Sequence, residues 1–378
     1  MKSVRSIRHL TNAPVLVRTS LNVPIAKGVV AGSYRLERAV PTIAYLARKH
    51  ARVIVIGHIG EAGTESLRPV YEAMKGFFPA IRFCDSVTGS VAIQAIRDLP
   101  AGGILMLENL RRNRGEVMND AAFAKELAAL ADYFVQDSFD VCHRTHASVV
   151  GVPLLLPSFA GLTLEEELKE LKRALKPKHP SLAIIGGAKF TTKEPVLVKL
   201  LSLYDHVFVG GALANDFMGE LGIPMEYSLR STEGVEGIRK LLSHPRLLLP
   251  VDEVIGPVGG TVSQSRVGIL DGKPPYEAVL DDGPETLALL TTHIRKAKTI
   301  LWNGPLGNYE NGFTEGTEAL ARLLAYSKAH TIVGGGDTIT AITKLGLNDR
   351  FSFISTGGGA MLEYLANGTL PGIDALSS

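Results

Sequence analysis

The chain is short of the features that mark several large classes of protein. It has only two cysteines, Cys84 and Cys142, among 378 residues, too few for a disulfide framework or a cysteine-rich metal site. This usage favours a reducing, cytoplasmic setting. Lys and Arg number 40 and Asp and Glu 38, so no strong overall charge would recruit nucleic acid.

Long apolar runs are also missing. The longest uncharged run, residues 147–164, contains two prolines and two glycines, which predicts a loop or buried connection and not a membrane span. Residues 1–10, MKSVRSIRHL, are basic but lead into no apolar stretch, so no secretory signal is expected. We therefore expect small-molecule substrates, a cytoplasmic monomer, and neither nucleic acid nor membrane as a partner.

Strand-like apolar runs alternate with helical patterns along the chain. The predicted strands are residues 15–21, 52–57, 104–108, 133–137, 182–185, 206–209, 247–251, 299–302, 331–333 and 351–355. Apolar strands alternating with helices indicate parallel sheets covered on both faces. Since this is too many strands for one comfortable core, we predict an α/β fold with two Rossmann-like, doubly wound parallel-sheet domains joined by a hinge helix.

The predicted domains are residues 1–160 and 161–364. Between them, residues 163–166 read Thr-Leu-Glu-Glu, a capping box that should begin the hinge helix, and Pro177 should end it. Residues 256–275 are glycine-rich and weakly patterned, which indicates a surface excursion of the second half.

Three strand–glycine stretches point to a phosphate-binding site in the second half. They are TIVGGGDT (331–338), SLAIIGGAK (181–189) and FSFISTGGGA (351–360). A strand that ends in glycines and turns into a helix presents free backbone N–H groups at a positive helix end. Asp337 adds a hard oxygen ligand for a magnesium ion that rides on the phosphates. The three loops together favour one large polyanionic ligand.

The first half carries cations and polar side chains near its strand ends. They are Arg18, Asn22, Arg35, His58, Arg111, His143, Arg144 and His146. Ligands of open α/β sheets collect at the carboxyl ends of the strands. Each residue taken singly suits a surface or core role, but the set favours a site for one small anion.

Two nucleotide-binding motifs are absent. No GxxxxGK[ST] run exists, which excludes a P-loop enzyme, and no GxGxxG run exists, which weakens a dinucleotide dehydrogenase. A small-anion site in one half and a polyphosphate site in the other fit phosphoryl transfer between two bound substrates.

The sequence resembles the phosphoglycerate kinase family along nearly its whole length. The matching blocks include RTSLNVP, SLRPVYEAM, LENLR, DVCHRTHAS, AIIGGAKFTTK, WNGPLGNYE, IVGGGDT, STGGGAMLEYL and LPGIDAL. The resemblance implies two domains facing each other across a hinged cleft, with residues 365–378 packing back on the first. The implied reaction moves a phosphoryl group between 1,3-bisphosphoglycerate and ADP.

The resemblance also implies roles for individual residues. Arg35 and Lys189 are the implied catalytic residues, and Asp337 is the implied magnesium ligand. The implied phosphoglycerate site consists of Asn22, Arg35, His58, Arg111 and Arg144. The implied nucleotide site consists of Lys189, Lys193, Gly210, Gly211, Asn303, Glu310, Gly334, Gly335, Gly336, Asp337 and Thr338.

The implied chemistry needs this inventory and little else. In the ATP-consuming direction the acceptor is a carboxylate, which is already ionised at neutral pH, so no general base is required. Catalysis then depends on positioning and on charge neutralisation by arginine, lysine, backbone amides and Mg²⁺. The expected cofactor is Mg²⁺, with ATP or ADP as a substrate.

Two departures from the family fall in the substrate half. Ser20 stands where the family has an aspartate, and Glu61 stands where it has a phosphate-binding arginine. Arg112 and Arg114, beside Arg111, are extra cations that could compensate. Arg112 is the poorer candidate in an extended segment, because adjacent side chains there point to opposite faces.

These departures leave two alternatives to an active phosphoglycerate kinase. One is a kinase of the same fold that acts on another small carboxylate. The other is a nucleotide-binding homologue with weak catalysis. Turnover of ATP with 3-phosphoglycerate separates the first interpretation from both.

Overall fold

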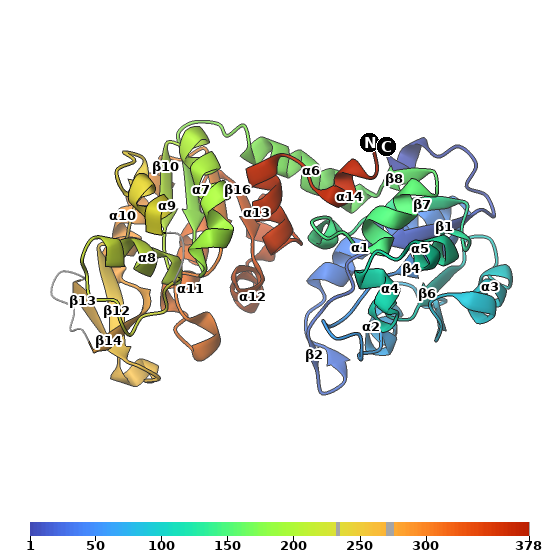
Figure 1. Cartoon of the computed structure of the whole chain (residues 1–378), viewed down its shortest axis with the longest axis horizontal. Coiled ribbons are helices and arrows are strands. Elements are labelled where there is room, and N and C mark those ends of the chain that lie inside the picture. Colours follow the sequence, from blue (N-terminus) through green and yellow to red (C-terminus); the bar gives the residue numbers. More distant parts are fainter. Residues whose placement is uncertain (232–234, 270–275, 378) are drawn as a thin grey trace. The chain divides into compact units, whose positions relative to one another are not determined.

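The protein is described by a computed structural model that covers residues 1–231, 235–269 and 276–377. It divides into two compact units (Figure 1), unit 1 with Met1–Lys169 and Asn367–Ser378, and unit 2 with Glu170–Ala366. The division falls inside α6 (Leu162–Ala174), later than the boundary expected at residue 160. Each unit holds a parallel sheet, which confirms the predicted α/β class.

The sheet of unit 1 has six strands in the order β5-β6-β4-β1-β7-β8, and every pairing in it is parallel. Its strands are β1 (Pro14–Arg18), β4 (Arg52–Ile56), β5 (Arg82–Cys84), β6 (Ile104–Leu107), β7 (Tyr133–Gln136) and β8 (Ser158–Ala160). The chain runs outward from β1 through β4 and returns to β7 on the other side. The carboxyl ends of β1 and β7 therefore form a topological switch point, where open α/β sheets bind ligands.

The strands β1, β4 and β6 are β-branched or leucine-rich and almost wholly buried, as expected of a sheet with both faces covered. Its helices are α1 (Tyr34–Arg48), α2 (Arg68–Met74), α3 (Gly89–Arg97), α4 (Arg114–Val117), α5 (Ala121–Ala128) and α14 (Pro371–Asp374). In α1, buried Leu36, Ile43 and Leu46 recur at helical spacing and join the sheet core. The C-terminal α14 belongs to unit 1, where the Gly372 amide donates to the Cys142 carbonyl at 2.8 Å.

The sheet of unit 2 also has six parallel strands, in the order β11-β10-β9-β15-β16-β17. They are β9 (Ser181–Ile185), β10 (His206–Val209), β11 (Leu247–Leu248), β15 (Thr299–Asn303), β16 (His330–Gly334) and β17 (Phe353–Ile354). Counted along the chain this is the order 3-2-1-4-5-6 of dinucleotide-binding folds, with its switch point between β9 and β15.

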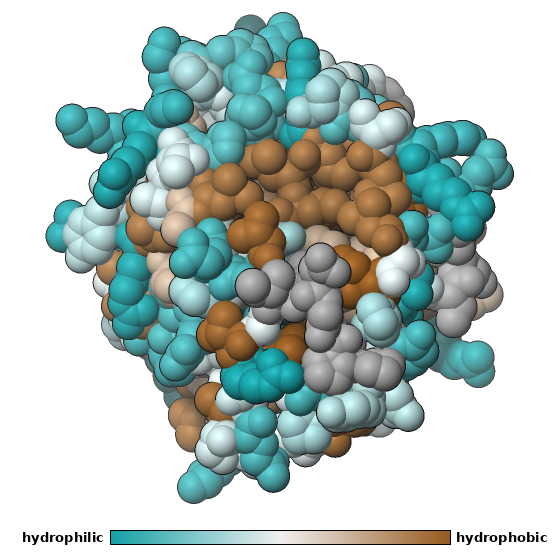
Figure 2. Space-filling model, turned by 90° about the vertical axis from the view of Figure 1, so that its left-hand side faces the viewer, coloured by the Kyte–Doolittle hydropathy of each residue, from teal (hydrophilic) through white to brown (hydrophobic). Residues whose placement is uncertain are grey.

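The helices of unit 2 are α7 (Phe190–Leu203), α8 (Ala212–Glu220), α9 (Val235–Leu242), α10 (Pro284–Ile294), α11 (Glu315–Ala325), α12 (Gly336–Lys344) and α13 (Gly358–Asn367), the last ending at the border with unit 1. Figure 2 shows an apolar area on one face of this unit, surrounded by hydrophilic side chains.

Unit 2 also contains an antiparallel sheet that the sequence analysis missed. Strands β12 (Asp252–Pro257), β13 (Arg266–Ile269) and β14 (Glu277–Asp282) pair in the order β13-β12-β14. The sequence analysis assigned no strand within residues 256–275, whereas residues 256, 257 and 266–269 belong to this sheet, and residues 270–275 lie outside the described part. In β12 and β13 the alternation is hard to see because Gly256 and Gly268 interrupt it.

The capping box predicted for residues 163–166 is wrong. Helix α6 begins at Leu162 and so already includes Thr163, and the Thr163 hydroxyl donates to the Arg38 carbonyl at 2.6 Å. The first amides of the helix are instead satisfied by Asp137, whose Oδ1 accepts from Thr163 and Leu164 at 2.9 and 3.3 Å. A carboxylate at the end of β7 thus caps a helix that starts 25 residues later, a contact with no local signature in the sequence.

Within the three described ranges, no helix has the length and apolar character that a membrane crossing needs.

Candidate functional site

In unit 1 a buried arginine organises the ends of β1 and β4. Arg18, the last residue of β1, is fully buried, and its Nε donates to Ser148 Oγ at 3.1 Å. Its Nη2 lies 3.0 Å from Nδ1 of His58, which follows β4. A guanidinium only donates, so Nδ1 accepts. Burial, with Arg18 and Arg111 nearby, lowers the pKa of His58 to about 2, and the imidazole is neutral with its proton on Nε2.

Three more predicted substrate residues meet around Gly60. The side-chain Oδ1 of Asn22 accepts from the Gly60 amide at 3.1 Å, and the Asn22 carbonyl accepts from Arg35 Nη1 at 2.5 Å. From η2 (Leu110–Arg112), Arg111 Nη1 donates to the Gly60 carbonyl at 2.5 Å. The loop after β4 thus brings together groups from three separate segments.

Arg144 is the fifth predicted substrate residue and lies at the rim. It follows η3 (Phe139–Val141), and its side chain is exposed. Its charge nonetheless affects the pKa of a buried histidine in the cluster. The pKa of His146 is lowered to about 4 by burial first, then by Arg111, Arg18 and Arg144.

Sequence reasoning gave no role to a buried network behind these cations. The Ser148 amide and hydroxyl donate to the two carboxylate oxygens of Glu116 at 2.9 and 2.6 Å, and Ser148 also holds Arg18. Glu116 is 1% exposed. The signal that could have found it is the Gly115-Glu116 pair that follows LENLR, since a buried glutamate needs donors of this kind.

The glutamate at position 61 pairs with a predicted substrate residue. Glu61 Oε2 lies 2.9 Å from Arg111 Nη1, and their side chains are 80% and 5% exposed. The extra cations are placed differently. Arg112 pairs with Glu108 at 3.0 Å, and both Arg112 and Arg114 line a separate cavity of 420 Å³ that none of the five predicted substrate residues lines. This geometry argues against either of them replacing the missing charge.

Unit 2 presents a pocket of 410 Å³ at the carboxyl ends of β9, β10, β15 and β16. Its lining includes Gly187, Gly211, Glu310 and Asp337. The Gly187 amide donates to the Pro305 carbonyl at 2.9 Å, which joins the loops at the switch point. A Cβ atom on Gly211, whose φ is +62°, would lie 2.8 Å from that carbonyl, so only glycine lets the chains approach here.

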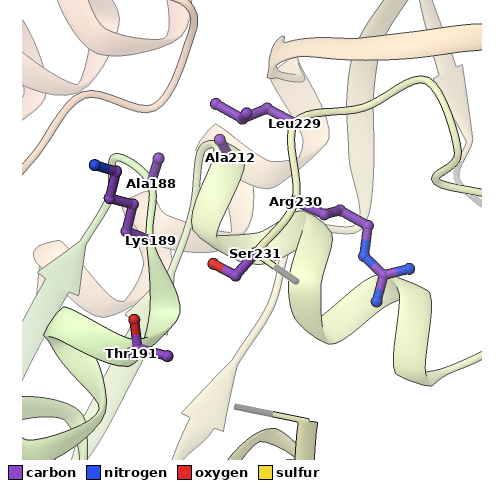
Figure 3. A pocket seen from close by; sticks show the side chains of 7 residues that line it. All are labelled: Ala188, Lys189, Thr191, Ala212, Leu229, Arg230 and Ser231. Atoms are coloured by element: carbon purple, nitrogen blue, oxygen red, sulfur yellow. The ribbon is translucent and has the colours of Figure 1, made fainter. Parts of the chain in front are cut away.

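An adjoining cavity of 290 Å³ shares Ala188, Ala212 and Leu229 with this pocket and is also lined by Lys189 (Figure 3). Lys189 precedes α7 in the left-handed region, at φ +63°, unusual for a residue with a side chain. In Figure 3 its side chain points away from Arg230, which forms ion pairs with Asp216 and Glu220 instead.

Lys193 lies one turn along α7 and is held close to the same loop. Its ammonium donates to the Ala188 carbonyl. Burial lowers the pKa of Lys193, and the nearby charge of Lys189 adds to the effect. Two ammonium groups thus flank the glycine loop after β9.

The start of α12, in the glycine loop that follows β16, is hydrogen-bonded to the loop after β15, and the end of β15 is bonded in turn to α13. Thr338 Oγ1 accepts from the Gly304 amide at 3.1 Å, and Asn303 Nδ2 donates to the Gly358 carbonyl at 3.4 Å. Gly335 has φ +104°. Among the predicted nucleotide residues, those that do not line either cavity are Lys193, Gly210, Asn303, Gly334, Gly335, Gly336 and Thr338.

Asp337 is the one predicted metal ligand, and its setting suits that role. It is half-buried in the pocket wall, and burial, aided by the charge of Glu310, raises its pKa. The described residues contain no group of three or more His, Cys, Asp or Glu side chains arranged for a metal. A single carboxylate fits Mg²⁺ that takes its other ligands from phosphates and water.

A buried acidic cluster under the pocket was not foreseen from the sequence. The Gly211 amide donates to Asp282 Oδ1 at 3.2 Å. Burial raises the pKa values of Asp282 and Glu253 well above the ordinary range. The charge of Asp281 adds to the effect on Asp282, and the charge of Asp282 adds to the effect on Glu253. Burial also raises the pKa of Asp281 to about 7. These groups lie on β12 and β14, the strands that sequence analysis did not find.

Two Rossmann-like units, one with cations at its strand ends and one with glycine loops around a pocket, are typical of an enzyme that transfers phosphoryl groups. The family model for phosphoglycerate kinase matches residues 4–368. The chain therefore belongs to the phosphoglycerate kinase family, the kinases of glycolytic phosphoryl transfer.

Individual relatives agree along the whole chain. The phosphoglycerate kinase of Rubrobacter xylanophilus is 41% identical over 99% of this chain and 98% of its own. That of Leptospira biflexa is 39% identical over 98% and 96%. Among solved structures, the phosphoglycerate kinase of Coxiella burnetii has a TM-score of 0.83 at 35% identity, covering 99% of this chain and 98% of its own. That of Pyrococcus horikoshii has a TM-score of 0.86 at 27% identity, covering 100% and 98%.

Proposed function

We propose that this enzyme moves a phosphoryl group between 1,3-bisphosphoglycerate and ADP, and between ATP and 3-phosphoglycerate in reverse. Unit 1 would bind the phosphoglycerate and unit 2 the nucleotide. The observation that carries the proposal is the contrast between the strand ends. In unit 1 they hold buried cations, whereas in unit 2 they hold glycine loops around a 410 Å³ pocket that contains Asp337.

In unit 1 the proposed substrate contacts are Asn22, Arg35, His58, Arg111 and Arg144. Guanidinium groups suit the phosphate and the carboxylate of the substrate. Arg35 would face the transferring group. Neutral His58 would donate from Nε2, because its Nδ1 is engaged by Arg18.

In unit 2 the proposed contacts form two sets. Lys189 and Lys193 would neutralise the phosphates, with Lys189 acting on the phosphoryl group in transit. The backbone-rich set is Gly210, Gly211, Asn303, Glu310, Gly334, Gly335, Gly336 and Thr338. Asp337 would hold Mg²⁺, which when bound neutralises phosphate charge.

The proposal extends to the cellular compartment and the oligomeric state. Both cysteines are free and buried, which suits a reducing cytoplasm. We propose a monomer with small-molecule substrates, ATP or ADP and a phosphoglycerate.

A coupled assay tests the proposal. Purified protein with Mg²⁺, ATP and 3-phosphoglycerate should form 1,3-bisphosphoglycerate, followed by NADH oxidation through glyceraldehyde-3-phosphate dehydrogenase. Calorimetry with ATP is the control for a folded nucleotide site. ATP binding without turnover of phosphoglycerate would contradict the proposal.

A kinase of the same fold for another small carboxylate is the second candidate. The Glu61–Arg111 ion pair favours it, because the carboxylate takes up part of the positive charge that a substrate phosphate would need. Higher kcat/KM with an unphosphorylated small carboxylate than with 3-phosphoglycerate would select this alternative.

A further inference from the structure

The switch point of unit 1 holds a carboxylate, Asp140, that is not among the proposed substrate contacts. We propose that Asp140 accepts a hydrogen bond from the substrate's hydroxyl group, and so selects a hydroxy acid. It would stand in for the aspartate that the family carries at the position of Ser20. This inference rests on the proposed function and deepens it by naming a specificity-determining residue.

Asp140 is fixed by two serines from neighbouring strand ends. Ser20, after β1, donates its hydroxyl to Asp140 Oδ1. Ser138, after β7, donates to the same oxygen at 2.5 Å. The two hydroxyl oxygens lie 3.1 Å apart, and the serines are 4% and 0% exposed. The carboxylate is therefore held against position 20, although it belongs to η3.

The surrounding groups explain why an acceptor is needed there. The guanidinium groups of Arg18, Arg35, Arg111 and Arg144 can bind phosphate and carboxylate, but none can accept a hydrogen bond. The lone pair on His58 Nδ1 is engaged by Arg18, and the side-chain oxygen of Asn22 accepts from the Gly60 amide. A substrate hydroxyl that enters this site would leave its hydrogen unpaired unless a carboxylate or carbonyl meets it.

Asp140 is better placed for the task than Glu116 or Glu61. Both oxygens of Glu116 accept from Ser148, and Glu61 is exposed on Arg111. The two serines bond Oδ1 of Asp140, so Oδ2 is the oxygen offered to a ligand. Asp140 is half-buried, which permits contact with a bound molecule.

The charge of Asp140 also reaches the cation cluster. Burial lowers the pKa of Arg18, and the charges of Glu116 and Asp140 oppose that effect. A purely structural role, as a counter-ion for Arg18, would therefore affect every substrate alike. Selection of a hydroxyl would affect only substrates that carry one, and this difference makes the two roles separable.

The test compares 3-phosphoglycerate with 3-phosphonooxypropanoate, which lacks the hydroxyl group, as acceptors from ATP. The wild-type kcat/KM should favour 3-phosphoglycerate by about 10- to 100-fold, typical of a hydrogen bond to a charged partner. Asp140→Ala should shrink the preference to about twofold, through loss on 3-phosphoglycerate alone. ATP affinity and thermal unfolding serve as controls for folding.

Moving the carboxylate provides the rescue. The double variant Ser20→Asp, Asp140→Ser should restore the preference, because position 20 lies within hydrogen-bond distance of the Asp140 oxygen. If Asp140→Ala does not fold, the isosteric Asp140→Asn should still lower the preference several-fold, since an amide oxygen is the weaker acceptor.

Three results would overturn the inference. They are an unchanged preference in the Asp140 variants, an equal slowing of both substrates, and no rescue by the double variant. A wild-type protein that binds ATP and turns over neither compound would instead refute the proposed function, and the inference with it.

Discussion

The switch points of the two units are built differently. In unit 1 the site consists of side chains, with Arg18 and His58 buried and hydrogen-bonded to each other. In unit 2 it consists largely of backbone, where Gly187 and Gly211 approach the Pro305 carbonyl. A site made of side chains can select a small anion by its shape. A site made of backbone amides binds any phosphate chain of the right length. Selectivity should therefore reside mainly in unit 1.

The largest expected effect concerns Lys189, a side chain in the otherwise backbone-rich candidate site of unit 2. Lys189→Ala should lower kcat by about 100- to 1000-fold and change the KM for ATP little, because its main contact forms in the transition state. Lys189→Arg, which keeps the charge, is the matched control. Steady-state kinetics with varied ATP measures both constants. An unchanged kcat would remove Lys189 from the mechanism.

The next effect concerns the acids buried under the pocket of unit 2. The raised pKa of Asp281, about 7, means that the folded state holds this proton more tightly than the unfolded state does. Stability from this group is complete below about pH 4 and is lost as the pH rises through about 7. We expect a loss on the order of 2 kcal/mol between pH 5 and pH 8.

Urea unfolding at several pH values measures this loss. Asp281→Asn, which keeps an acceptor for the Gly316 amide, should flatten part of the pH dependence. Asp137, whose pKa is also raised to about 7, should contribute separately from unit 1. A stability that rises from pH 5 to pH 8 would contradict this account.

A third prediction tests whether the site of unit 2 depends on glycine geometry. Gly335→Ala should weaken ATP binding about 10-fold, because φ +104° costs a side chain on the order of 1–3 kcal/mol. Gly359→Ala is the matched control, since its Cβ would meet no atom within 4 Å and its φ is ordinary. Calorimetry should show a normal Kd for the control. Equal Kd values for both variants would show that ATP binding does not require the left-handed conformation at Gly335.

The smallest effect concerns the ion pair in unit 1. Glu61→Gln should tighten 3-phosphoglycerate binding about 2- to 5-fold by freeing Arg111, a modest gain because Glu61 is 80% exposed and screened by water. Glu61→Arg should tighten it further. ATP affinity is the control and should not change. Weaker phosphoglycerate binding in both variants would mean that Glu61 contacts the substrate favourably.

Local patterns in the sequence predicted much of this fold. The continuous apolar runs at β1, β4, β9 and β15 indicated buried parallel strands, and the glycines after β16 marked the turn into α12. The gathering of Asn22, Arg35 and Arg111 around Gly60 needed the sheet order as well, because the three come from distant segments. That gathering could be expected only from the rule that ligands bind at strand ends.

Other features depend on contacts across the chain and had no local signal. Asp137 caps α6 from the end of β7, so the apparent capping box at Thr163 was misleading. The acids lie on β12 and β14, two short antiparallel strands that meet only through the pairing of separate segments. The proposed role of Asp140 depends on its hydrogen bond with Ser20, which is 120 residues away in the sequence.

Hydrogen exchange with each substrate added separately tests whether the two units divide the binding of the substrates between them. 3-Phosphoglycerate should protect the segments after β1, β4 and β7 in unit 1, with little change in unit 2. MgADP should protect residues 186–193 and 334–338 in unit 2, with little change in unit 1. Protection of the same unit by both ligands, or an exchange of the two patterns, would contradict the division of binding between the units.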